Sequence, residues 1–583
     1  MNTSILGRLA ATTAATAFAF ALVTSGSSNA AGISTHFKAS GPDFTSGDDR
    51  DELRTPLDFE LEAAGNPVGP SSLILFSRCR NLPGDQIAPP GGFAPIAAPE
   101  HDAIVGDTQF FFADGTHCYN PQNESNIVAN PANPMNLVTS ANEYRCDCNA
   151  VYYSKNGGAT WTNVVLPGWT SSTGGKAAFS HLSSFGDPVL AFSADGSRLY
   201  FSGIVGNGGL GGNQGLSGVA VAVSTDGGAH WSAPRMVSFT SSNNIFNDKE
   251  WLAVAPDGTV YLTWTRFFFD PVHGYRESPI VVSKSVDGGN TWSDWVKVSD
   301  SAHPFDQGSN PAVGPDGTLY VAYEGATPSS GYSQDAVVVA RSTDGGATFS
   351  NTEVVRVYDD FTCYPFQIGA QGRQTLSFEQ FRINSFPNIA LDRTVGTTGK
   401  LAIVFADDRN NASCLNGTAF VGPTQNQVFM VTSSDGVHWS GPTQITSDTF
   451  DKVYPSIAAD NGRIVVGYYT RAYSPTPTPA DRSCARQVLD TTTNTVVPYP
   501  GPNSLQPVCM DYAARRSDDG FASELRLTAQ SSNPWTLFAG AFIGDYTGMA
   551  LDNTVKGIAV WTDFRGNPPT TTPNQDVLVR PGI

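Results

Sequence analysis

The chain has 583 residues, and its 34 Lys and Arg residues against 53 Asp and Glu residues give a formal net charge of −19 at pH 7. Such an acidic chain repels polyanions, which argues against nucleic acid and anionic membrane surfaces as partners. With 58 glycines, 39 prolines and only 15% charged residues, the composition favours a large β protein that is rich in loops.

The first 31 residues have the pattern of a secretion signal. Arg8 supplies a positive start, residues 9–23 are apolar and rich in alanine, and Ser28-Asn29-Ala30 offers small residues for cleavage. No later run approaches the roughly 20 apolar residues that cross a bilayer. We therefore expect a monomer without a membrane span that is secreted, to the extracellular space or to the periplasm.

After the signal, residues 32–120 are expected to form an irregular N-terminal extension that packs against a main body over residues 121–583. All eight cysteines lie beyond the signal, and an even number of cysteines in an exported chain favours disulfides. Cys363 with Cys414, and Cys484 with Cys509, each bracket one long insertion, so we predict these two bonds.

The other four cysteines are assigned by their spacing. Cys146 and Cys148 are separated by a single residue, which looks too short for a comfortable bridge between them. We therefore expect both to pair outward, with Cys79 and Cys118.

A short turn sequence recurs along the chain, and we call its copies the Asp turns. An Asp beside paired glycines suits a tight turn, because glycine adopts positive φ freely and the carboxylate accepts nearby backbone N–H groups. Repeats of this kind indicate a modular array. The copies are SKNGGATW (154–161), STDGGAHW (224–231), SVDGGNTW (285–292), STDGGATF (342–349) and the shorter SSDGVHW (433–439) and SDDGF (517–521).

A second recurring phrase precedes the Asp turns. It places D-G or N-G between two runs of alternating apolar residues, as in KEWLAVAPDGTVYLTWTR from Lys249 and SNPAVGPDGTLYVAYEG from Ser309. Runs of period two joined by these dipeptides predict β-hairpins. Phrase and Asp turn together give four antiparallel strands per unit.

Four-stranded units bury both faces only by stacking, and a closed ring of them is a β-propeller. Units begin near residues 121, 185, 247, 308, 384 and 453, and a last phrase spans residues 544–565. The sequence thus predicts an all-β propeller of six or seven blades, with seven favoured. We expect an N-terminal strand to complete the last blade.

One face of such a ring collects the starts of the inner strands and the loops between second and third strands. Arginines there can bind a carboxylate in a fixed fork, and carboxyl groups beside them can act as general acids or bases. For any single residue, a structural ion pair between blades is the plainer alternative. The residues at these positions are Asp187, Asp248, Lys249, Glu250, Arg266, Asp306, Gln307, Glu324, Arg382, Asn384, Asp407, Asp408, Arg409, Asp451, Lys452, Tyr454, Arg471, Asp545, Tyr546, Asp563 and Arg565.

No cofactor or metal site is predicted from the sequence. The eight histidines are scattered without an HExxH pattern, and the cysteines lack the spacing of zinc ligands. A structural Ca²⁺ ion stays an open alternative. Asn123-Glu124-Ser125 has the form of a glycosylation sequon, which matters only in a glycosylating host.

The Asp turns, read as S-x-D-G-G-x-T-W, resemble the Asp-box repeats of bacterial neuraminidases, and residues 121–565 resemble the sialidase superfamily of β-propellers. This resemblance implies a retaining glycosidase with a Tyr nucleophile assisted by Glu, an Asp acid/base, and three arginines that clamp the substrate carboxylate. A Tyr nucleophile is a known exception to the usual pair of carboxylates.

Carried over residue by residue, the resemblance makes Tyr546 in DYTGMAL the candidate nucleophile. Asp545, Glu250 and Asp248 are the accompanying candidate catalytic carboxylates.

The candidate clamp comes from arginines at the same face. Arg409, Arg471 and Arg565 are its plausible members, and Arg266 and Arg382 are further candidates for substrate binding.

The leading hypothesis is therefore a secreted, sialidase-like enzyme that hydrolyses glycosidic bonds of an acidic sugar. A propeller that binds extracellular glycan or protein without catalysis is one alternative, and a polysaccharide lyase with a Tyr or His base is another. Hydrolysis requires Tyr546 or a pair of carboxyl groups about 5–10 Å apart beneath the arginines, whereas binding requires only an arginine-rich and aromatic surface.

Overall fold

The computed structural model describes residues 100–104, 110–111, 117–118, 121–144, 146, 148–206, 216–270, 274–359, 362–367, 373–416, 420–490, 495–536, 542–565 and 575–583. The expected secretion signal, and residues 32–99 of the expected N-terminal extension, lie outside these residues. In the described part of the chain, no helix combines the length and the apolar character that crossing a membrane requires.

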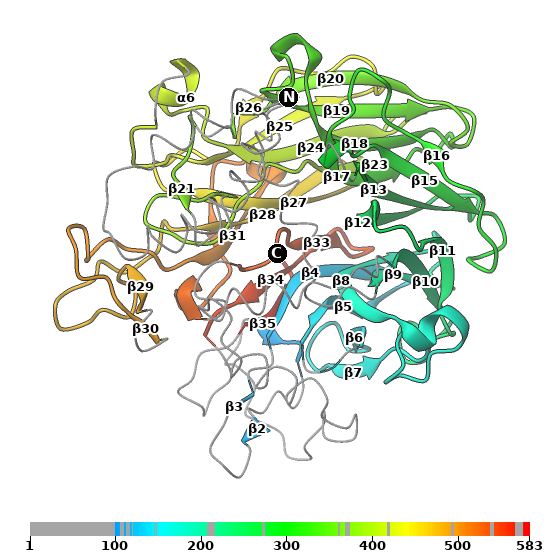
Figure 1. Ribbon diagram of the computed structural model, residues 1–583, viewed down its shortest axis with the longest axis horizontal. Coiled ribbons are helices and arrows are strands. Elements are labelled where there is room, and N and C mark those ends of the chain that lie inside the picture. Colours follow the sequence, from blue (N-terminus) through cyan, green and yellow to red (C-terminus); the bar gives the residue numbers. More distant parts are fainter. Residues whose placement is uncertain are drawn as a thin grey trace, which may run out of the picture.

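Seven antiparallel sheets of four main strands form the blades of a propeller, which confirms the predicted fold and its seven blades (Figure 1). Blade 1 contains β4 (Gln122–Asn130), β5 (Asn133–Glu143), β6 (Ala150–Ser154) and β7 (Thr162–Val165). Blade 2 contains β8 (Ser183–Phe192), β9 (Leu199–Gly206), β10 (Ser217–Ser224) and β11 (Arg235–Thr240). Blade 3 contains β12 (Ile245–Val254), β13 (Val260–Asp270), β15 (Ile280–Ser285) and β16 (Val296–Lys297), with β14 (Gly274–Glu277) paired to β13.

The remaining blades follow the same order. Blade 4 contains β17 (Asp306–Val313), β18 (Leu319–Ala326), β19 (Asp335–Ser342) and β20 (Ser350–Arg356). Blade 5 contains β23 (Asn388–Asp392), β24 (Lys400–Asp407), β25 (Gln427–Ser433) and β26 (Thr443–Gln444). Blade 6 contains β27 (Lys452–Asp460), β28 (Arg463–Thr470), β31 (Asp511–Arg516) and β32 (Leu525–Arg526). Blade 7 contains β33 (Gly548–Leu551), β34 (Gly557–Asp563), β35 (Asp576–Pro581) and β1 (His101–Asp102).

The ring is closed by a strand from the N-terminal side of the chain. In Figure 1 the colours run around the ring from blue to red, so that β4 lies beside β33 and β34. The outer strand of blade 7 is β1, in which His101 pairs with Val579 and Asp102 with Leu578. The predicted completion of the last blade by an N-terminal strand is thereby confirmed.

The other described elements are short and lie in the connections. They are the hairpins β2 (Phe110–Phe111) with β3 (His117–Cys118), β21 (Phe366–Gln367) with β22 (Arg373–Gln374) and β29 (Gln487–Asp490) with β30 (Thr495–Pro498), the helix α6 (Ala412–Asn416), and the 3-10 turns η2 (Ala177–His181), η3 (Pro328–Ser330), η4 (Ser517–Asp519) and η5 (Pro534–Thr536).

The Asp turns close the outer hairpins through their own side chains. After β19, the Ser342 hydroxyl donates to Asp344 at 2.7 Å and accepts the Gly346 N–H at 2.9 Å, and the Thr348 hydroxyl donates to Asp344 at 2.6 Å. The turn after β15 repeats this set with the same residue types. These bonds satisfy backbone N–H groups where the strand ladder stops, which explains why the sequence repeats.

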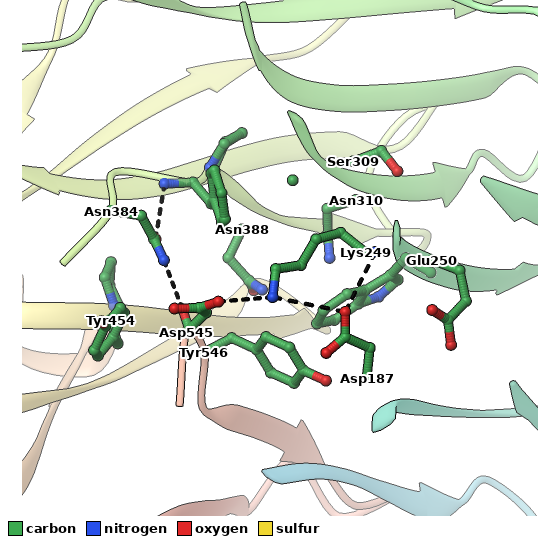
Figure 2. Close-up of a pocket in the computed structure, with 15 residues that line it drawn as sticks. Asp187, Lys249, Glu250, Ser309, Asn310, Asn384, Asn388, Tyr454, Asp545 and Tyr546 are labelled. Atoms are coloured by element: carbon green, nitrogen blue, oxygen red, sulfur yellow. Dashed lines mark hydrogen bonds and ion pairs between the residues drawn. The ribbon is translucent and has the colours of Figure 1, made fainter. Parts of the chain in front are cut away.

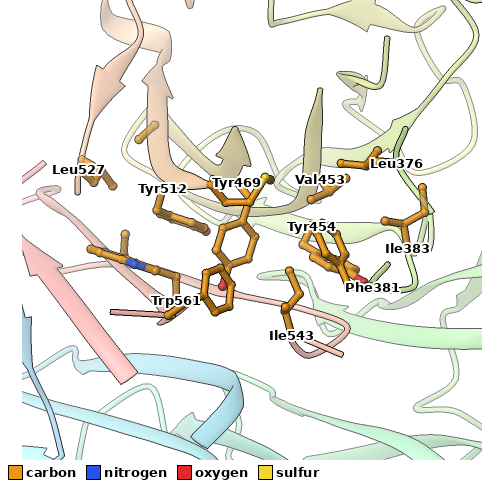
Figure 3. Packing of buried hydrophobic residues seen from close by; sticks show 14 of the residues in the cluster. Leu376, Phe381, Ile383, Val453, Tyr454, Tyr469, Tyr512, Leu527, Ile543 and Trp561 are labelled. Atoms are coloured by element: carbon orange, nitrogen blue, oxygen red, sulfur yellow. The ribbon is translucent and has the colours of Figure 1, made fainter. Parts of the chain in front are cut away.

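The hydrophobic core lies between the blades. Seven clusters of buried side chains fill the seven interfaces between neighbouring blades, because each flat sheet buries both of its faces against the next sheet. Figure 3 shows the interface of blades 6 and 7, where the Tyr512 ring stacks on Trp561 at 5.0 Å between ring centroids. This packing holds the inner strands in fixed positions around the axis.

The disulfides agree with the sequence in two cases and correct it in a third. The predicted bonds Cys363–Cys414 and Cys484–Cys509 are present. Cys146, however, is bonded to Cys148, so the expected outward pairing of these two residues was wrong. Their Cα atoms lie 5.2 Å apart, a separation that a disulfide spans without moving the backbone. Cys79 and the side chain of Cys118 lie outside the described residues.

Candidate functional site

The innermost strands bend at one common level. The first strands of neighbouring blades contact one another around the axis, and five of them, β4, β8, β12, β17 and β27, shift register near their starts. Each bend contains a left-handed residue, which is uncommon for residues other than glycine. Bulges of this kind turn a side chain toward a new direction. The five residues, with their φ angles, are Glu124 (55°), Asp187 (53°), Lys249 (50°), Gly308 (66°) and Tyr454 (51°).

Four of these five residues, all except Glu124, line a small cavity, which we call the axial cavity (Figure 2). It contains about 40 Å³ of room for water, enough for roughly three molecules. Several of its lining residues, including Trp251, Phe386 and Tyr546, are partly exposed, so that the cavity is approached from solvent on their side. The lining residues are Asp187, Lys249, Glu250, Trp251, Gly308, Ser309, Asn310, Asn384, Phe386, Pro387, Asn388, Tyr454, Pro455, Asp545 and Tyr546.

Lys249 is the centre of the buried charges. Its Nζ lies 2.7 Å from Asp545, 3.4 Å from Glu124 and 3.6 Å from Asp187, and all four side chains are buried. Burial opposes its charge, yet Asp187, Asp545 and Glu124 together raise the pKa of Lys249 well above its usual value. Lys249 therefore remains an ammonium ion and joins blades 1, 2, 3 and 7.

Asp545 receives a second cation from Arg382. The guanidinium of Arg382 donates through Nε to Oδ1 of Asp545 at 2.8 Å and through Nη2 to Oδ2. Although burial favours the neutral form, Arg382 and Lys249 hold the pKa of Asp545 well below its usual range. Asp545 is thus a fixed carboxylate at the start of blade 7.

The pKa values of Glu124 and Asp187 shift in the opposite direction to that of Asp545. Burial raises the pKa of Glu124 well above its usual value and also raises that of Asp187. The two carboxyl groups also act on each other, and this interaction raises the pKa of Glu124 further and lowers that of Asp187. Two neighbouring carboxyl groups whose pKa values are pushed apart can supply an acid and a base at the same place.

Tyr546 extends toward Asp187 (Figure 2), and the charge of Glu124 also acts on it. Its hydroxyl is buried and forms no hydrogen bond with another described residue. Burial, together with Glu124 and Asp187, raises the pKa of Tyr546 well above its usual value. The ring packs edge-to-face on Trp251 at 5.4 Å between centroids, which fixes its direction.

The other two predicted catalytic carboxylates lie beside Lys249 on β12. Glu250 lines the axial cavity, and burial and the charge of Asp187 raise its pKa well above the usual value. Asp248 is not part of the described lining, and it accepts a hydrogen bond of 3.4 Å from Gln307 of blade 4. Tyr546, Asp545 and Glu250 therefore line the cavity together, whereas Asp248 is not part of its described lining.

Among the five predicted substrate-binding arginines, Arg382 hydrogen-bonds Asp545, a residue of the described cavity lining. Arg409 donates to Asp407 of its own blade at 2.8 Å and lies 4.4 Å from the centre of the Phe429 ring. Arg565 donates to Asp563 at 2.7 Å and lies 3.0 Å from Glu100. These two guanidinium groups are occupied within the fold.

The remaining two arginines are also bound by the chain. Arg266 donates to Asn247 at 2.8 Å and lies 5.2 Å from the centre of the Trp295 ring. Arg471 forms an ion pair with Asp451 and donates to the Ser377 carbonyl at 2.7 Å. Neither belongs to the described lining of the axial cavity.

Arg471 also lies 3.8 Å from a second carboxylate, Glu379, whose titration makes stability depend on pH. Burial outweighs Arg471 and Arg486 and raises the pKa of Glu379 from 4.5 to about 8. Between these pH values the folded protein keeps a proton that the unfolded chain has lost, so the free energy of unfolding falls as pH rises from about 4.5 to 8. Glu379→Gln should remove this fall, on the order of a few kcal/mol, in denaturant titrations at pH 5 and pH 8.5.

Two comparisons make the test specific. Burial raises the pKa of Asp408 to about 8 as well, so Glu379→Gln leaves part of the pH dependence in place. Glu277, 40% exposed beside Lys297, is the control, and Glu277→Gln should keep the full pH dependence of the wild type. An undiminished pH dependence in Glu379→Gln would contradict the assignment.

One group of carboxylates could hold a metal ion. Glu324 of β18, Asp335 of β19 and Asp359 are buried, and one oxygen of each lies within 4.8 Å of the others. Oxygen ligands at this spacing suit a hard cation such as Ca²⁺. The group lies in blade 4 and the segment after it, and none of the three residues belongs to the described lining of the axial cavity.

The sequence interpretation missed Glu124. Asn123-Glu124-Ser125 has the form of a sequon, but Asn123-Glu124-Ser125-Asn126 also occupies the same place in blade 1 as Gln307-Gly308-Ser309-Asn310 in blade 4. Alignment of these two phrases would have placed Glu124 among the residues at the bends of the innermost strands. Its neighbours in the fold, Lys249 and Asp545, come from blades 3 and 7, and their approach follows from ring closure.

No family model matches, and no curated protein matches. Among solved structures, the chain is similar to Trypanosoma rangeli sialidase (14% identity, 62% of this chain and 55% of that chain, TM-score 0.36). It is also similar to a protein of unknown function from Dyadobacter fermentans (11% identity, 81% of this chain and 96% of that chain, TM-score 0.38). A third similar structure is an α-L-arabinofuranosidase from Fusarium graminearum (13% identity, 67% of this chain and 91% of that chain, TM-score 0.38).

The chain spans 55% and 63% of the lengths of two sialidases that it resembles, the Trypanosoma rangeli enzyme and Hadza microbial sialidase Hz136. These identities and TM-scores are too low to carry a function from any of these proteins to this chain.

Proposed function

We propose that the protein is a secreted glycoside hydrolase that works at the axial cavity by a covalent, retaining mechanism. The observation that supports this function is the buried Tyr546 hydroxyl without a hydrogen-bond partner among the described residues, on which the carboxyl groups of Glu124 and Asp187 both act. A tyrosine becomes nucleophilic when a neighbouring base removes its proton as it attacks.

The steps follow from this arrangement. The Tyr546 oxygen attacks the anomeric carbon, its proton passes to the ionised member of the Glu124–Asp187 pair, and the glycosidic C–O bond breaks. The protonated member of the pair gives its proton to the departing alcohol. Water then attacks the tyrosyl glycoside while the pair works in reverse, which regenerates Tyr546 and releases the sugar with retained configuration.

The other residues of the cavity support this chemistry. Lys249 and Arg382 hold Asp545 in place, and Lys249 also stabilises the negative charge that the Glu124–Asp187 pair carries throughout. Glu250, with its raised pKa, is a second carboxylic acid that lines the cavity. The small volume means that the sugar meets these groups from the side of Trp251 and Phe386 instead of being enclosed.

Release of 4-methylumbelliferone from a panel of fluorogenic glycosides tests the proposal. The panel contains sialoside and glucuronide as acidic sugars, and galactoside, mannoside and arabinofuranoside as neutral ones. The sequence resemblance implies the acidic group. We expect turnover of at least one glycoside by the wild type and by Lys297→Met, which changes an exposed ion pair with Glu277. A folded protein that releases no product from any of them would refute hydrolysis.

A second function is favoured by the ion pairs beside the cavity, in which the cations are bound to carboxylates of the chain. The described cations around the cavity are bound by carboxylates of the chain, and the room left is small, as in a purely structural network. A propeller that binds extracellular glycan without catalysis fits this observation. Binding on a glycan array without turnover in the fluorogenic panel would support this second function.

A further inference from the structure

Lys249 and Arg382 form a clamp for a carboxylate, and the carboxylate in it belongs to the chain. Arg382 donates through Nε to Asp545 at 2.8 Å and through Nη2 to the other oxygen, and Lys249 donates to that second oxygen at 2.7 Å. The backbone N–H of Asp545 donates to Glu124 at 3.2 Å, and its carbonyl accepts from Asn384 at 3.2 Å. Asp545 is therefore fixed in the clamp from its side chain and from its backbone.

The described cations beside the cavity have carboxylate partners without a ligand. Among the described residues, Lys249 and Arg382 line the cavity or pair with its lining, as do the carboxyl groups of Glu124, Asp187, Glu250 and Asp545, and buried Asp248 also acts on Lys249 and Glu250. The two cations keep the pKa of Asp545 low, whereas burial raises the pKa values of Glu124 and Glu250. Arg382 is thus paired with Asp545, and Lys249 with Asp545, Glu124 and Asp187, so that neither cation is left for an anionic ligand.

The remaining polar groups of the lining suit hydroxyl groups. The side-chain oxygen of Asn310 accepts the Ile389 N–H at 3.1 Å, and that of Asn388 accepts the Ile457 N–H at 3.1 Å. With each oxygen bound to the neighbouring blade, the NH₂ group of each amide is the donor that a ligand would meet. Neutral donors beside a partly exposed Trp251 ring are the usual means of holding a sugar.

We propose that the axial cavity receives a neutral sugar, without a carboxylate, sulfate or phosphate group. This inference rests on the proposed function, because it names the class of glycan for the same site. An acidic sugar would have to displace Asp545 from Lys249 and Arg382, or else bury an anion without a cation, and both are strongly unfavourable. The substrate class thus differs from the acidic sugar that the sequence resemblance implies.

The ratio of kcat/KM values in the fluorogenic panel measures this selectivity. We expect the best neutral glycoside to exceed both the sialoside and the glucuronide by at least about 100-fold, because a polar site that leaves a buried charge unpaired rejects its ligand. Turnover of the sialoside or glucuronide at a rate equal to or above that of every neutral glycoside would overturn the inference and leave the hydrolase intact.

Asp545→Ala tests the clamp by a gain of binding. Removal of this carboxylate should allow acetate to fill the clamp, so that acetate raises the Tm of the variant and not that of the wild type. The variant should also bind glucuronate at least about 10-fold more tightly than the wild type does. Asp545→Asn, which keeps the shape of the side chain, should show neither gain. A folded Asp545→Ala that ignores acetate and glucuronate would contradict the clamp.

Direct binding separates this inference from the hydrolase. If no glycoside is hydrolysed, the proposed function fails, and calorimetry of the wild type with methyl galactoside, methyl arabinofuranoside and glucuronate decides the ligand class. Binding of a neutral sugar without binding of glucuronate would retain the inference. Binding of glucuronate, or of none of the three, would overturn it.

Discussion

Tyr546→Phe is expected to reduce kcat/KM for the best glycoside by at least about 10³-fold, because the variant lacks the attacking oxygen. Its stability should remain close to that of the wild type. The hydroxyl forms no hydrogen bond with another described residue, so its removal leaves no partner unsatisfied. Turnover in the fluorogenic panel and unfolding in denaturant, measured on the same preparation, check both expectations.

Tyr469→Phe is the matched control. The Tyr469 hydroxyl donates to the Thr562 carbonyl at 2.8 Å and accepts the Thr562 N–H at 2.9 Å within the core of blades 6 and 7. Its removal should cost about 1–3 kcal/mol of unfolding free energy, because it leaves buried backbone groups without partners, and turnover should persist. Full activity in Tyr546→Phe, or an equal loss of activity in Tyr469→Phe, would remove Tyr546 from the chemistry.

Lys249→Met should be the most destabilising substitution at the axis. It leaves Asp545, Glu124 and Asp187 buried without their shared cation, and a broken buried ion pair typically costs about 3–5 kcal/mol. The free energy of unfolding, measured by denaturant titration at pH 7, gives the loss. Part of it should be recovered at low pH, where the carboxyl groups take up protons.

Lys297→Met provides the comparison for the same side-chain change. Lys297 pairs with Glu277 at 3.2 Å, but both side chains are more than a third exposed, at 38% and 40%. Solvent-exposed pairs contribute little, so we expect a loss below about 1 kcal/mol. Equal losses in the two variants would show that the charges at the axis do not hold the blades together.

The fold was predictable because it repeats. Each Asp turn, such as residues 342–349, marks one outer hairpin, and each D-G or N-G phrase marks one inner hairpin. The phrases predicted six or seven blades, with seven favoured, and closure of the ring predicted that an N-terminal strand completes the last blade. That strand is β1, which has only two residues and no pattern of its own.

The site was predictable in part. Asp187, Lys249, Tyr454 and Tyr546 lie near the starts of inner strands, and the topology alone places such positions around the axis. Their partners depend on backbone bends that no pattern of apolar residues records. The left-handed conformation of Glu124, at a φ of 55°, is an example, because glutamate rarely adopts it.

The directions of the arginine side chains could not be predicted, for a different reason. The sequence shows that Arg409 and Arg565 follow Asp407 and Asp563, but it does not show whether each guanidinium turns back to that carboxylate or toward the axis. In the fold both turn back, at 2.8 and 2.7 Å. The Cys146–Cys148 disulfide could not be predicted for a similar reason, because it depends on the local backbone, in which the two Cα atoms lie 5.2 Å apart.

Trapping of the covalent intermediate tests the hydrolase most directly. The wild type is treated with a 2-fluoro glycosyl fluoride of the neutral sugar that it hydrolyses best, and intact mass spectrometry is followed by peptide mapping. A retaining enzyme with a tyrosine nucleophile should gain the mass of one fluorosugar on the peptide that contains Tyr546. The absence of an adduct on an active enzyme, or its attachment to a carboxyl group such as Asp187, would contradict the proposed mechanism.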